Sequence, residues 1–268
     1  MNHAPEQNQN CALLDVFFQQ LADARQRVLM LDYDGTLAPF RIERDQATPY
    51  PGVREILNRI LDAGQTRVVV VSGRWTQEVV PLLGLSHPLE IWGSHGWEHR
   101  QADGGWKIFT MDKQAAVGLD DARNWLVSEG LSERAEVKPA CLALHWRGLN
   151  EAECHRLRAR VLSRWTKLAR RTGLEINKFD GGLELRVPGR NKGLVVQTIL
   201  SEMDNRTAAG YLGDDLTDED AFTALEGRGL SALVRQEFRP TRAHIWLKPP
   251  EELLEFLGRW HHTTGGKP

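Results

Sequence analysis

The sequence has few cysteines, no long apolar run and almost no net charge, and each absence excludes a class of protein. Its three cysteines, Cys11, Cys141 and Cys154, lie far apart without disulfide or metal-site spacing, so we expect reduced thiols. No apolar run approaches the length that spans a membrane, and the N-terminal MNHAPEQNQN lacks the basic and apolar regions of a secretory signal. We therefore expect a cytoplasmic chain with no membrane partner.

The charge balance also argues against a polyanionic partner. A formal net charge of -2 gives no overall attraction to nucleic acid. The arginine-rich helix predicted over residues 151–171 would suit a nucleic-acid surface, but such a helix in a nearly neutral protein is more often a solvated face. We expect no nucleic-acid partner, and a real one would bind with a steep salt dependence. The composition leaves the oligomeric state open.

Apolar runs of strand length alternate with amphipathic helices near both ends of the chain. Strands are predicted over residues 27–31, 67–72, 89–92 and 208–212, and helices over residues 52–63, 75–83 and 192–203. This alternation is typical of βαβ units in a Rossmann-like parallel sheet, so the predicted fold class is α/β. At 268 residues the chain could form one large domain or two smaller ones.

The middle of the chain has a different order of predicted helices and strands. Between two predicted helices, near residues 112–129 and 151–171, and after the second of them, short strand candidates give a block of α+β character. We predict that this block is a smaller domain inserted into the core. The predicted boundaries are 1–112 for the first part of the core, 113–188 for the inserted domain and 189–268 for the second part of the core.

Two of the predicted strands run directly into aspartates. The stretch LMLDYDGTL contains Asp32 and Asp34, and the stretch YLGDDLTDED contains Asp214, Asp215 and Asp218. Ligands of open α/β sheets bind at the carboxyl ends of the strands. If the two strands are neighbours, the carboxylates converge, and a cation must offset their repulsion. Oxygen ligands of this kind suit Mg²⁺.

Each acidic stretch also has a plainer interpretation. Asp34-Gly35 is a common turn pair, which alone would leave Asp32 and Asp34 as solvated loop carboxylates. GDDLTDED could be an acidic helix start, because aspartate and glutamate favour the first helical turn. For the second stretch, the helix start and the metal site are compatible.

Two further signals fit a phosphate ligand at the same sheet edge. Ser72 ends a predicted strand, and with the backbone amides at Gly73 it could cradle a phosphate. Lys192 stands near a predicted helix start, where it could neutralise the phosphate charge. Taken singly, Ser72 could be a helix cap and Lys192 a surface lysine. Their order along the chain, with the two acidic stretches, favours the functional interpretation.

These segments together resemble a known enzyme family. LDYDGTL, VSGR, Lys192-Gly193 and GDDLTDED are similar to the four motifs of the haloacid dehalogenase superfamily of phosphohydrolases, and most similar in wording to trehalose-6-phosphate phosphatases. The resemblance extends from Val28 to about Leu257. It implies the Rossmann-like core of that superfamily with an inserted cap domain, a phosphatase activity and Mg²⁺ as the cofactor.

The resemblance also implies a role for each motif residue. Asp32 would be the nucleophile that forms an aspartyl phosphate, and Asp34 would protonate the leaving sugar oxygen and then activate water. Thr36 and Ser72 would hold phosphate oxygens, and Lys192 would balance the charge. The implied metal ligands are Asp32, the Asp34 carbonyl, Asp214, and either Asp218 or Asp215.

A second, shorter resemblance lies in the inserted block. Glu136-Val-Lys138 followed by His145-Trp-Arg147, and Glu184-Leu-Arg186, resemble segments of the family's cap that contact the sugar. The expected substrate-binding residues are therefore Glu136, Lys138, Arg147 and Glu184. Cross-strand ion pairing would explain the same residues without a ligand.

The inserted block also departs from the family pattern. Where the family usually has Gly-Lys before that glutamate, this chain has Phe179-Asp180, and Lys178 is the candidate replacement for the missing lysine. GSHG stands where G-N-H-G is more usual. These departures concern the sugar and leave the phosphatase chemistry intact.

The expected reaction is hydrolysis of a soluble sugar phosphate, foremost trehalose 6-phosphate. The mixture of carboxylates and cations in the inserted block suits the hydroxyl groups of a disaccharide. Glucosylglycerol phosphate and sucrose phosphate stay open as substrates. A mutase of the same superfamily and a non-catalytic sugar-phosphate-binding protein are the alternative functions, although binding alone does not require the Asp32 and Asp34 pair.

Overall fold

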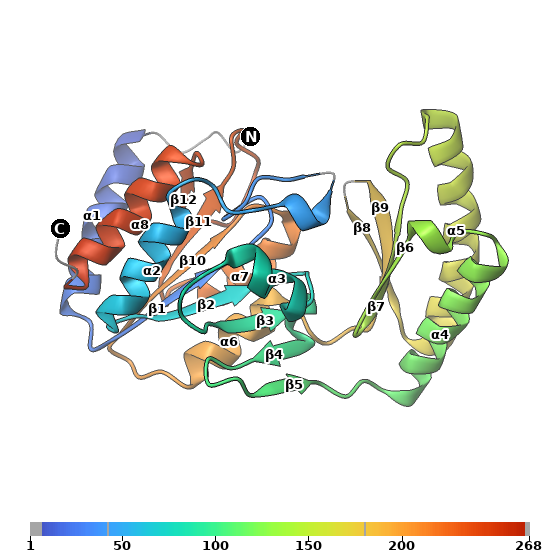
Figure 1. Cartoon of the computed structure of the whole chain (residues 1–268), viewed down its shortest axis with the longest axis horizontal. Helices are drawn as coiled ribbons and strands as arrows, with labels where there is room; N and C mark the ends of the chain where they lie inside the picture. The colour runs from blue at the N-terminus through green and yellow to red at the C-terminus, as the bar shows by residue number, and fades with distance from the viewer. Residues whose placement is uncertain (1–6, 42, 180, 266–268) are drawn as a thin grey trace. The chain divides into compact units, whose positions relative to one another are not determined.

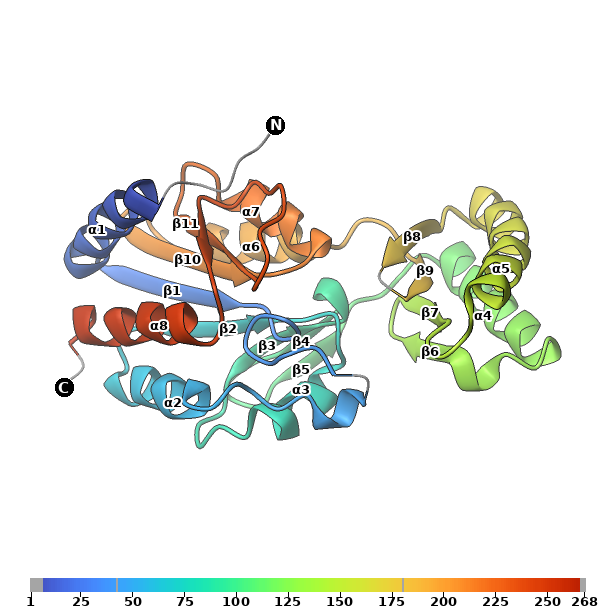
Figure 2. The same ribbon diagram turned by 90° about the horizontal axis from the view of Figure 1, so that it is seen from above.

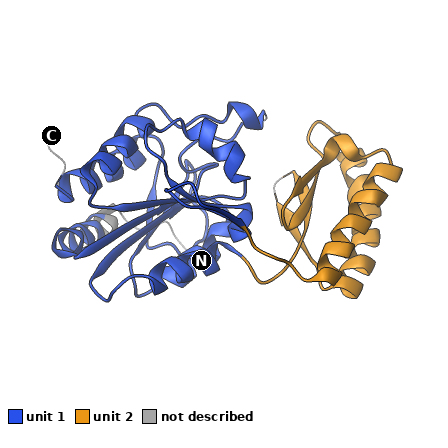
Figure 3. Ribbon diagram, turned by 60° about the horizontal axis from the view of Figure 1, so that its bottom comes forward, with its two compact units in different colours: residues 1–107, 191–268 blue, residues 108–190 orange. Residues whose placement is uncertain are grey.

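The computed structural model describes residues 7–41, 43–179 and 181–265 and divides the chain into two compact units. Unit 1 combines Met1–Lys107 with Asn191–Pro268, and unit 2 is Ile108–Arg190 (Figure 3). Along the described residues, none of the helices combines the length and apolarity needed to cross a membrane.

Unit 1 is built on an eight-stranded sheet with the order β12-β11-β10-β1-β2-β3-β4-β5 (Figure 1). The pairs from β12 through to β3 are parallel, and β4 runs antiparallel to β3. The strands are β1 (Gln26–Leu31), β2 (Arg67–Val71), β3 (Glu90–Gly93), β4 (Glu98–Arg100), β5 (Trp106–Ile108), β10 (Thr207–Gly213), β11 (Leu230–Val234) and β12 (Ile245–Leu247).

Helices cover both faces of this sheet. Figure 2 shows α2, α3 and α8 on one side of the strands and α6 and α7 on the other. The helices are α1 (Gln7–Asp23), α2 (Val53–Ala63), α3 (Thr76–Leu83), α6 (Lys192–Ser201), α7 (Glu219–Leu225) and α8 (Glu251–Thr263). Short 3₁₀ turns are η1 (Arg44–Gln46), η2 (Ser94–Gly96) and η4 (Leu216–Asp218). The parallel-dominated, two-faced sheet confirms the predicted α/β class.

The first helix was not predicted from the sequence, although its packing has a clear pattern. In α1, Phe17, Phe18 and Leu21 are buried in one core cluster together with residues of α2, α3 and α8. Leu14 packs against the same cluster. These four positions have the spacing of one helical face. The apolar spacing within residues 14–21 is therefore the sequence signal for this helix.

Unit 2 is an antiparallel sheet of four strands in the order β6-β7-β9-β8. Its strands are β6 (Ala135–Lys138), β7 (Cys141–His145), β8 (Glu175–Phe179) and β9 (Gly182–Arg186). Its helices are α4 (Lys113–Ser128) and α5 (Glu151–Thr172), with the 3₁₀ turn η3 (Ser132–Arg134) between α4 and β6. Leu142 and Leu144 of β7, and Leu183 and Leu185 of β9, are fully buried, and every second residue faces the opposite side of the sheet.

Helix α5 begins and ends as its sequence dictates. Asn150 and Glu153 form a reciprocal capping box at its start, and Gly173 ends it in the left-handed conformation. Its buried stripe contains Leu157, Val161 and Trp165. Arginines occupy positions between these buried residues. One of them, Arg160, forms an ion pair at 3.3 Å with Glu129, the residue that caps the C-terminus of α4.

Candidate active site

The sheet register brings the predicted site residues of unit 1 to one edge. On β1, Leu31 lies opposite Leu212 of β10 and Val70 of β2. Asp32 therefore leaves β1 at the level where β10 and β2 also end, and its N–H donates to the Leu212 carbonyl at 2.9 Å. Because the three strands are parallel, their carboxyl ends meet at this edge, as the sequence predicted.

Asp32 is a buried carboxylate held by a lysine and a threonine. It is only 4% exposed. Lys192 Nζ donates to Asp32 Oδ1 at 2.7 Å, and Thr36 Oγ1 lies 3.4 Å from Asp32 Oδ2. Burial tends to lower the pKa of Lys192, but the carboxylates of Asp218 and Asp32 raise it above its ordinary value. The ammonium group therefore stays charged inside the site.

Helix α6 positions Lys192. Asn191 caps the helix with its Oδ1, which accepts from the Leu194 N–H at 2.8 Å, so the helix begins at Lys192 itself. Lys192 Nζ donates both to Asp32 and to Asp218 Oδ1, the latter at 2.8 Å. The lysine thus joins the ends of two strands through one cation.

Asp32, Asp214 and Asp218 form a buried acidic cluster, which we call the acidic edge. One carboxylate oxygen from each lies within 4.8 Å of the others. Burial raises the pKa of Asp32 to about 7, against the effect of Lys192 and with a further contribution from Asp218. Burial and the neighbouring Asp32 raise the pKa of Asp214 well above its ordinary range. A cation among these oxygens would remove this penalty.

The carboxylate oxygens of Asp214 are the ones in the cluster that accept no hydrogen bond from the described residues. Both of its carboxylate oxygens are buried and lack a hydrogen-bond partner among the described residues. Gly35, with a left-handed φ of 81°, lies directly against this carboxylate, because an added Cβ would come 2.1 Å from Asp214 Oδ2. The glycine of DYDGT therefore lets the Asp34-Gly35 backbone approach Asp214.

Asp218 is already saturated by donors. Its Oδ1 accepts from Lys192 and from the Tyr211 hydroxyl at 2.6 Å. Its Oδ2 accepts from the N–H groups of Asp214 and Asp215, at 3.1 and 3.0 Å. Four donors occupy the acceptor capacity of one carboxylate. Asp218 is thus fixed by hydrogen bonds at the centre of the cluster.

Asp215 lies outside the acidic edge. It is the N-cap residue of the short η4 turn in a capping box with Asp218, and its N–H donates to the Asp218 carboxylate at 3.0 Å. The sequence could not separate Asp215 from Asp218, because the choice depends on how the turn after β10 folds. Only the second of the two carries a carboxylate within the cluster.

Asp34 is paired with an arginine for which the sequence suggested no role. Arg74 Nε and Nη2 donate to the two carboxylate oxygens of Asp34, each at 2.6 Å. Arg74 Nη1 donates to the Arg44 carbonyl at 2.7 Å. The Asp34 side chain is 28% exposed, whereas that of Arg74 is 5% exposed. A buried, bidentate guanidinium therefore fixes a carboxylate that is open to solvent. The arginine that ends VSGR was the available signal.

Ser72 and Gly73 lie beside a strained loop. Ser72 is buried, and its Oγ accepts from the Arg74 N–H at 3.1 Å. The GSHG stretch places Ser94 and His95 at φ values of 50° and 55°, a conformation that non-glycine residues rarely adopt. The His95 ring packs against Gly73, where a Cβ would come 2.6 Å from Nε2. Gly73 therefore has no room for a side chain.

In unit 2, the face of the sheet opposite the buried leucines carries charged residues, which we call the polar face. Glu136 and Lys138 of β6 and Glu184 of β9 lie on this face with Cys141 and His145 of β7. Lys138 Nζ lies 3.4 Å from Glu136 Oε1 and 4.0 Å from Glu184 Oε1. His145 Nε2 lies 3.0 Å from Glu136 Oε2. The Lys138 ammonium group thus lies between two carboxylates, and the His145 ring contacts one of them.

The structure brings three of the four predicted sugar-binding residues together. Glu136, Lys138 and Glu184 share the polar face, whereas Arg147 is exposed two residues beyond the end of β7. Lys178 lies opposite Leu183 and therefore on the other side of the sheet from Glu184, so it does not replace the missing lysine. Asp180 lies outside the described residues.

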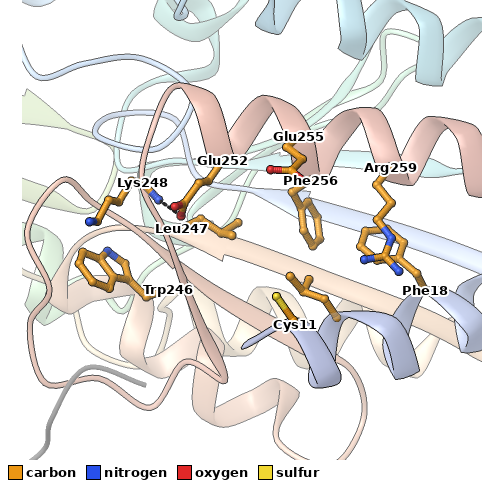
Figure 4. A pocket seen from close by; sticks show the side chains of 10 residues that line it. Cys11, Phe18, Trp246, Leu247, Lys248, Glu252, Glu255, Phe256 and Arg259 are labelled. Carbon is orange, nitrogen blue, oxygen red and sulfur yellow. Dashed lines mark hydrogen bonds between the residues drawn. The ribbon is translucent and has the colours of Figure 1, made fainter. Parts of the chain in front are cut away.

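A separate cavity of about 380 Å³ lies between α1, β12 and α8 (Figure 4). Its walls combine Phe18 and Phe256 with charged side chains, and two of these have partners. Arg259 pairs with an aspartate of α1 at 2.6 Å, and Glu252 accepts from the Lys248 N–H at 2.8 Å. Within the described part of the chain, the acidic cluster with metal-binding geometry is the acidic edge.

Comparison with known proteins identifies relatives over most of the chain. The profile of the trehalose-phosphatase family matches residues 30–244. A probable trehalose-phosphate phosphatase J from Arabidopsis thaliana is 29% identical over 267 residues, which cover 92% of this chain and 70% of the relative. A probable trehalose-phosphate phosphatase 3 from Oryza sativa is 31% identical over 260 residues, which cover 88% and 69%.

Solved structures share the fold. The C-terminal domain of trehalose-6-phosphate phosphatase from C. albicans superposes with a TM-score of 0.78 at 20% identity, covering 97% of this chain and 98% of that one. At this identity the likeness shows the fold alone. It confirms the α/β fold class that the sequence motifs implied.

Proposed function

The chain belongs to the trehalose-phosphatase family, and from that premise we propose that it is a Mg²⁺-dependent phosphatase that converts trehalose 6-phosphate to trehalose and phosphate. Its relatives are named trehalose-phosphate phosphatases, which are phosphoric monoester hydrolases. The observation that carries the proposal is the acidic edge, where Asp32, Asp214 and Asp218 meet Lys192 at the carboxyl ends of β1 and β10.

Asp32 is the proposed nucleophile. One of its carboxylate oxygens forms a bond to phosphorus while the bond from phosphorus to the sugar oxygen breaks, which leaves an aspartyl phosphate. Lys192 and Thr36 hold the carboxylate in a single orientation. Lys192 also offsets the negative charge that the phosphate brings.

Asp34 is the proposed general acid and base. It gives a proton to the departing sugar oxygen and takes one from the water that hydrolyses the aspartyl phosphate. Its partial exposure suits both steps, because the substrate and water can reach it. Arg74 holds both carboxylate oxygens, so the group stands in one orientation before the substrate arrives. Ser72 and the Gly73 N–H are the proposed partners of the phosphate oxygens.

The residues of the acidic edge fit a Mg²⁺ ion. The carboxylate oxygens of Asp214, which have no hydrogen-bond partner among the described residues, and the raised pKa of Asp32 are the properties of a donor set that suits a cation. We propose that Asp32, Asp214 and the Asp34 carbonyl hold the ion and that Asp218 orients these groups through its four hydrogen bonds. Asp215 has a capping role instead. When bound, Mg²⁺ supplies positive charge to the transferring phosphoryl group.

The polar face of unit 2 is the proposed origin of sugar recognition. Glu136, Lys138 and Glu184 offer charged donors and acceptors that suit hydroxyl groups of a second sugar ring. Arg147 is proposed to join them from its exposed position. The family relationship favours trehalose 6-phosphate over glucosylglycerol phosphate and sucrose phosphate. The substrate partner is thus a small soluble molecule, and we propose a cytoplasmic location for this metabolic role.

A phosphate-release panel tests the proposal. The full chain should hydrolyse trehalose 6-phosphate with the highest kcat/KM among trehalose 6-phosphate, glucosylglycerol phosphate and sucrose phosphate. EDTA should abolish the activity, and Mg²⁺ should restore it. Release without preference among the three substrates would leave a phosphatase of another specificity. Binding of the sugar phosphate in Mg²⁺ without any release would favour a sensor instead.

A further inference from the structure

The loop between β11 and β12 carries Arg239 against the acidic turn that follows β10. Arg239 Nε donates to the Asp214 carbonyl at 3.2 Å, and Nη2 donates to the Asp215 carbonyl at 2.7 Å. Its side chain is 16% exposed. One planar guanidinium group therefore spans two successive carbonyls of the turn, outside the motifs that the sequence analysis identified.

The peptide group between Asp214 and Asp215 is held at both of its edges. Its carbonyl accepts from Arg239 and, at the longer distance of 3.4 Å, from Arg235 Nη1. Its N–H donates to Asp218 Oδ2, which also accepts from the N–H of Asp214. The peptides on either side of Asp214 are thus fixed. The direction in which its carboxylate leaves the backbone is fixed with them.

The arginine reaches the turn from an anchored loop. Nη1 of Arg239 pairs with the Glu219 carboxylate at the start of α7. Glu219 also accepts from Thr241 Oγ1 and from the Arg242 N–H, each at 2.8 Å. The segment that carries the guanidinium group is therefore tied to the helix next to the acidic edge.

We propose that Arg239 is a positioning residue that orients Asp214 for metal binding through the backbone of the turn. The inference rests on the proposed function, since the ion is the proposed Mg²⁺. Lysine could supply the charge of Arg239 but could not span two carbonyls with one planar fork. Losing a partner that orients a metal ligand typically weakens metal affinity by about 10- to 100-fold.

Calorimetric titration of the full chain with Mg²⁺, without substrate, tests the proposal. Arg239→Gln should raise the Kd for Mg²⁺ by about 10- to 100-fold. Arg239→Lys should recover only part of that loss, and its Kd decides the matter if Arg239→Gln does not fold. Arg235→Gln is the matched variant at the same carbonyl, and because its contact is long it should change Kd by less than about threefold.

Arg228→Gln separates positioning from plain stability. Arg228 Nη2 donates to the Leu200 carbonyl at 3.2 Å, away from the acidic turn. Its loss should lower Tm and leave the Kd for Mg²⁺ unchanged. An Arg239→Gln or Arg239→Lys chain that binds Mg²⁺ as the wild type does would overturn this inference alone. A wild-type chain that does not bind Mg²⁺ would overturn the metal part of the proposed function and this inference with it.

Discussion

The acidic edge of unit 1 and the polar face of unit 2 both bury charged side chains, but they differ in the number of carboxylates that surround each cation. At the acidic edge, three carboxylates surround the single ammonium group of Lys192. On the polar face, Lys138 lies between Glu136 and Glu184, and His145 contacts Glu136 from the other side. Three carboxylates therefore share one ammonium group at the acidic edge, whereas two carboxylates share one on the polar face.

This difference explains why the two regions suit different ligands. Uncompensated carboxylates raise one another's pKa, and Asp32 reaches about 7 through burial and its neighbours. Such a cluster gains free energy when it binds a cation. The polar face instead presents oriented donors and acceptors to neutral hydroxyl groups. Cys141 extends the polar face as a neutral donor, because burial and Glu184 raise the pKa of its thiol.

The largest expected effect follows from removing the nucleophile. Asp32→Asn should lower kcat by about 10⁴-fold or more, because the amide cannot form the aspartyl phosphate. The loss should be equal for trehalose 6-phosphate and for an aryl phosphate, since the chemistry resides in unit 1. Phosphate release measures both. Asp62→Asn, at an aspartate whose side chain is 61% exposed, is the matched control and should retain full activity. Activity in Asp32→Asn would exclude the covalent mechanism.

The next effect concerns the orientation of the acid and base. Arg74→Lys keeps the charge but loses the bidentate contact with Asp34, and should lower kcat by about 10²-fold with little change in KM. Arg54→Lys is the control, because Arg54 donates to two backbone carbonyls at the end of α3, at 2.8 and 2.9 Å, and to no carboxylate among the described residues. Steady-state kinetics on both substrates would show the split. Equal losses in the two variants would remove the special role of Arg74.

Removing Mg²⁺ should change the free energy of unfolding through the acidic edge and not through the polar face. At a Mg²⁺ concentration of 100 times Kd, binding should add about 2.7 kcal/mol to the free energy of unfolding. Asp214→Asn should abolish this gain and stabilise the metal-free chain, because it removes one of the crowded charges. Glu184→Gln, on the polar face, should keep the full response. Urea unfolding with Mg²⁺ and with EDTA measures all three chains, and a Mg²⁺ response that survives in Asp214→Asn would place the ion elsewhere.

The smallest effect uses a compensated group at the opposite end of the unit 1 sheet. Glu90 accepts from Arg67 at 2.8 Å and contacts His99 at 3.0 Å. Against the opposing effect of burial, these partners lower the pKa of Glu90 to about 2 from an ordinary 4.5. Because the folded-state pKa is lowered, the stability gained is present above pH 4.5 and is lost as the pH falls toward 2.

Glu90→Gln should therefore destabilise the chain at pH 7 by about 1–2 kcal/mol. The difference from the wild type should shrink at pH 3, where the wild type has lost part of the same contribution. Urea unfolding at the two pH values gives the comparison. A difference that stays constant with pH would mean that the packing of Glu90, and not its charge, contributes to the free energy of unfolding.

Much of the acidic edge could be predicted because its residues directly follow recognisable strands. Parallel strands place Asp32, Ser72 and Asp214 at one edge whatever the details of the packing. The choice between Asp215 and Asp218 could not be predicted, since it depends on the geometry of η4. Arg239 left no signal, because it meets the acidic turn from a loop that is distant in sequence.

The polar face was harder to predict because adjacent residues of a strand face opposite sides of the sheet. The candidate Lys178 follows Asn177, which is the residue that lies opposite Glu184. A shift of one position moves a side chain to the other face of the sheet. The register therefore had to be known before any residue near Glu184 could be assigned to the sugar. Helix α1, in contrast, carried its periodic signal in the sequence.

The most direct test of the division between chemistry and sugar recognition is one kinetic comparison. Phosphate release by the wild type and by Glu184→Ala would be measured with trehalose 6-phosphate and with a small aryl phosphate. We expect kcat/KM to fall by about 10- to 100-fold for trehalose 6-phosphate, the size of one or two lost hydrogen bonds to a charged group, and to change little for the aryl phosphate. Equal losses on both substrates, or none on trehalose 6-phosphate, would contradict this division.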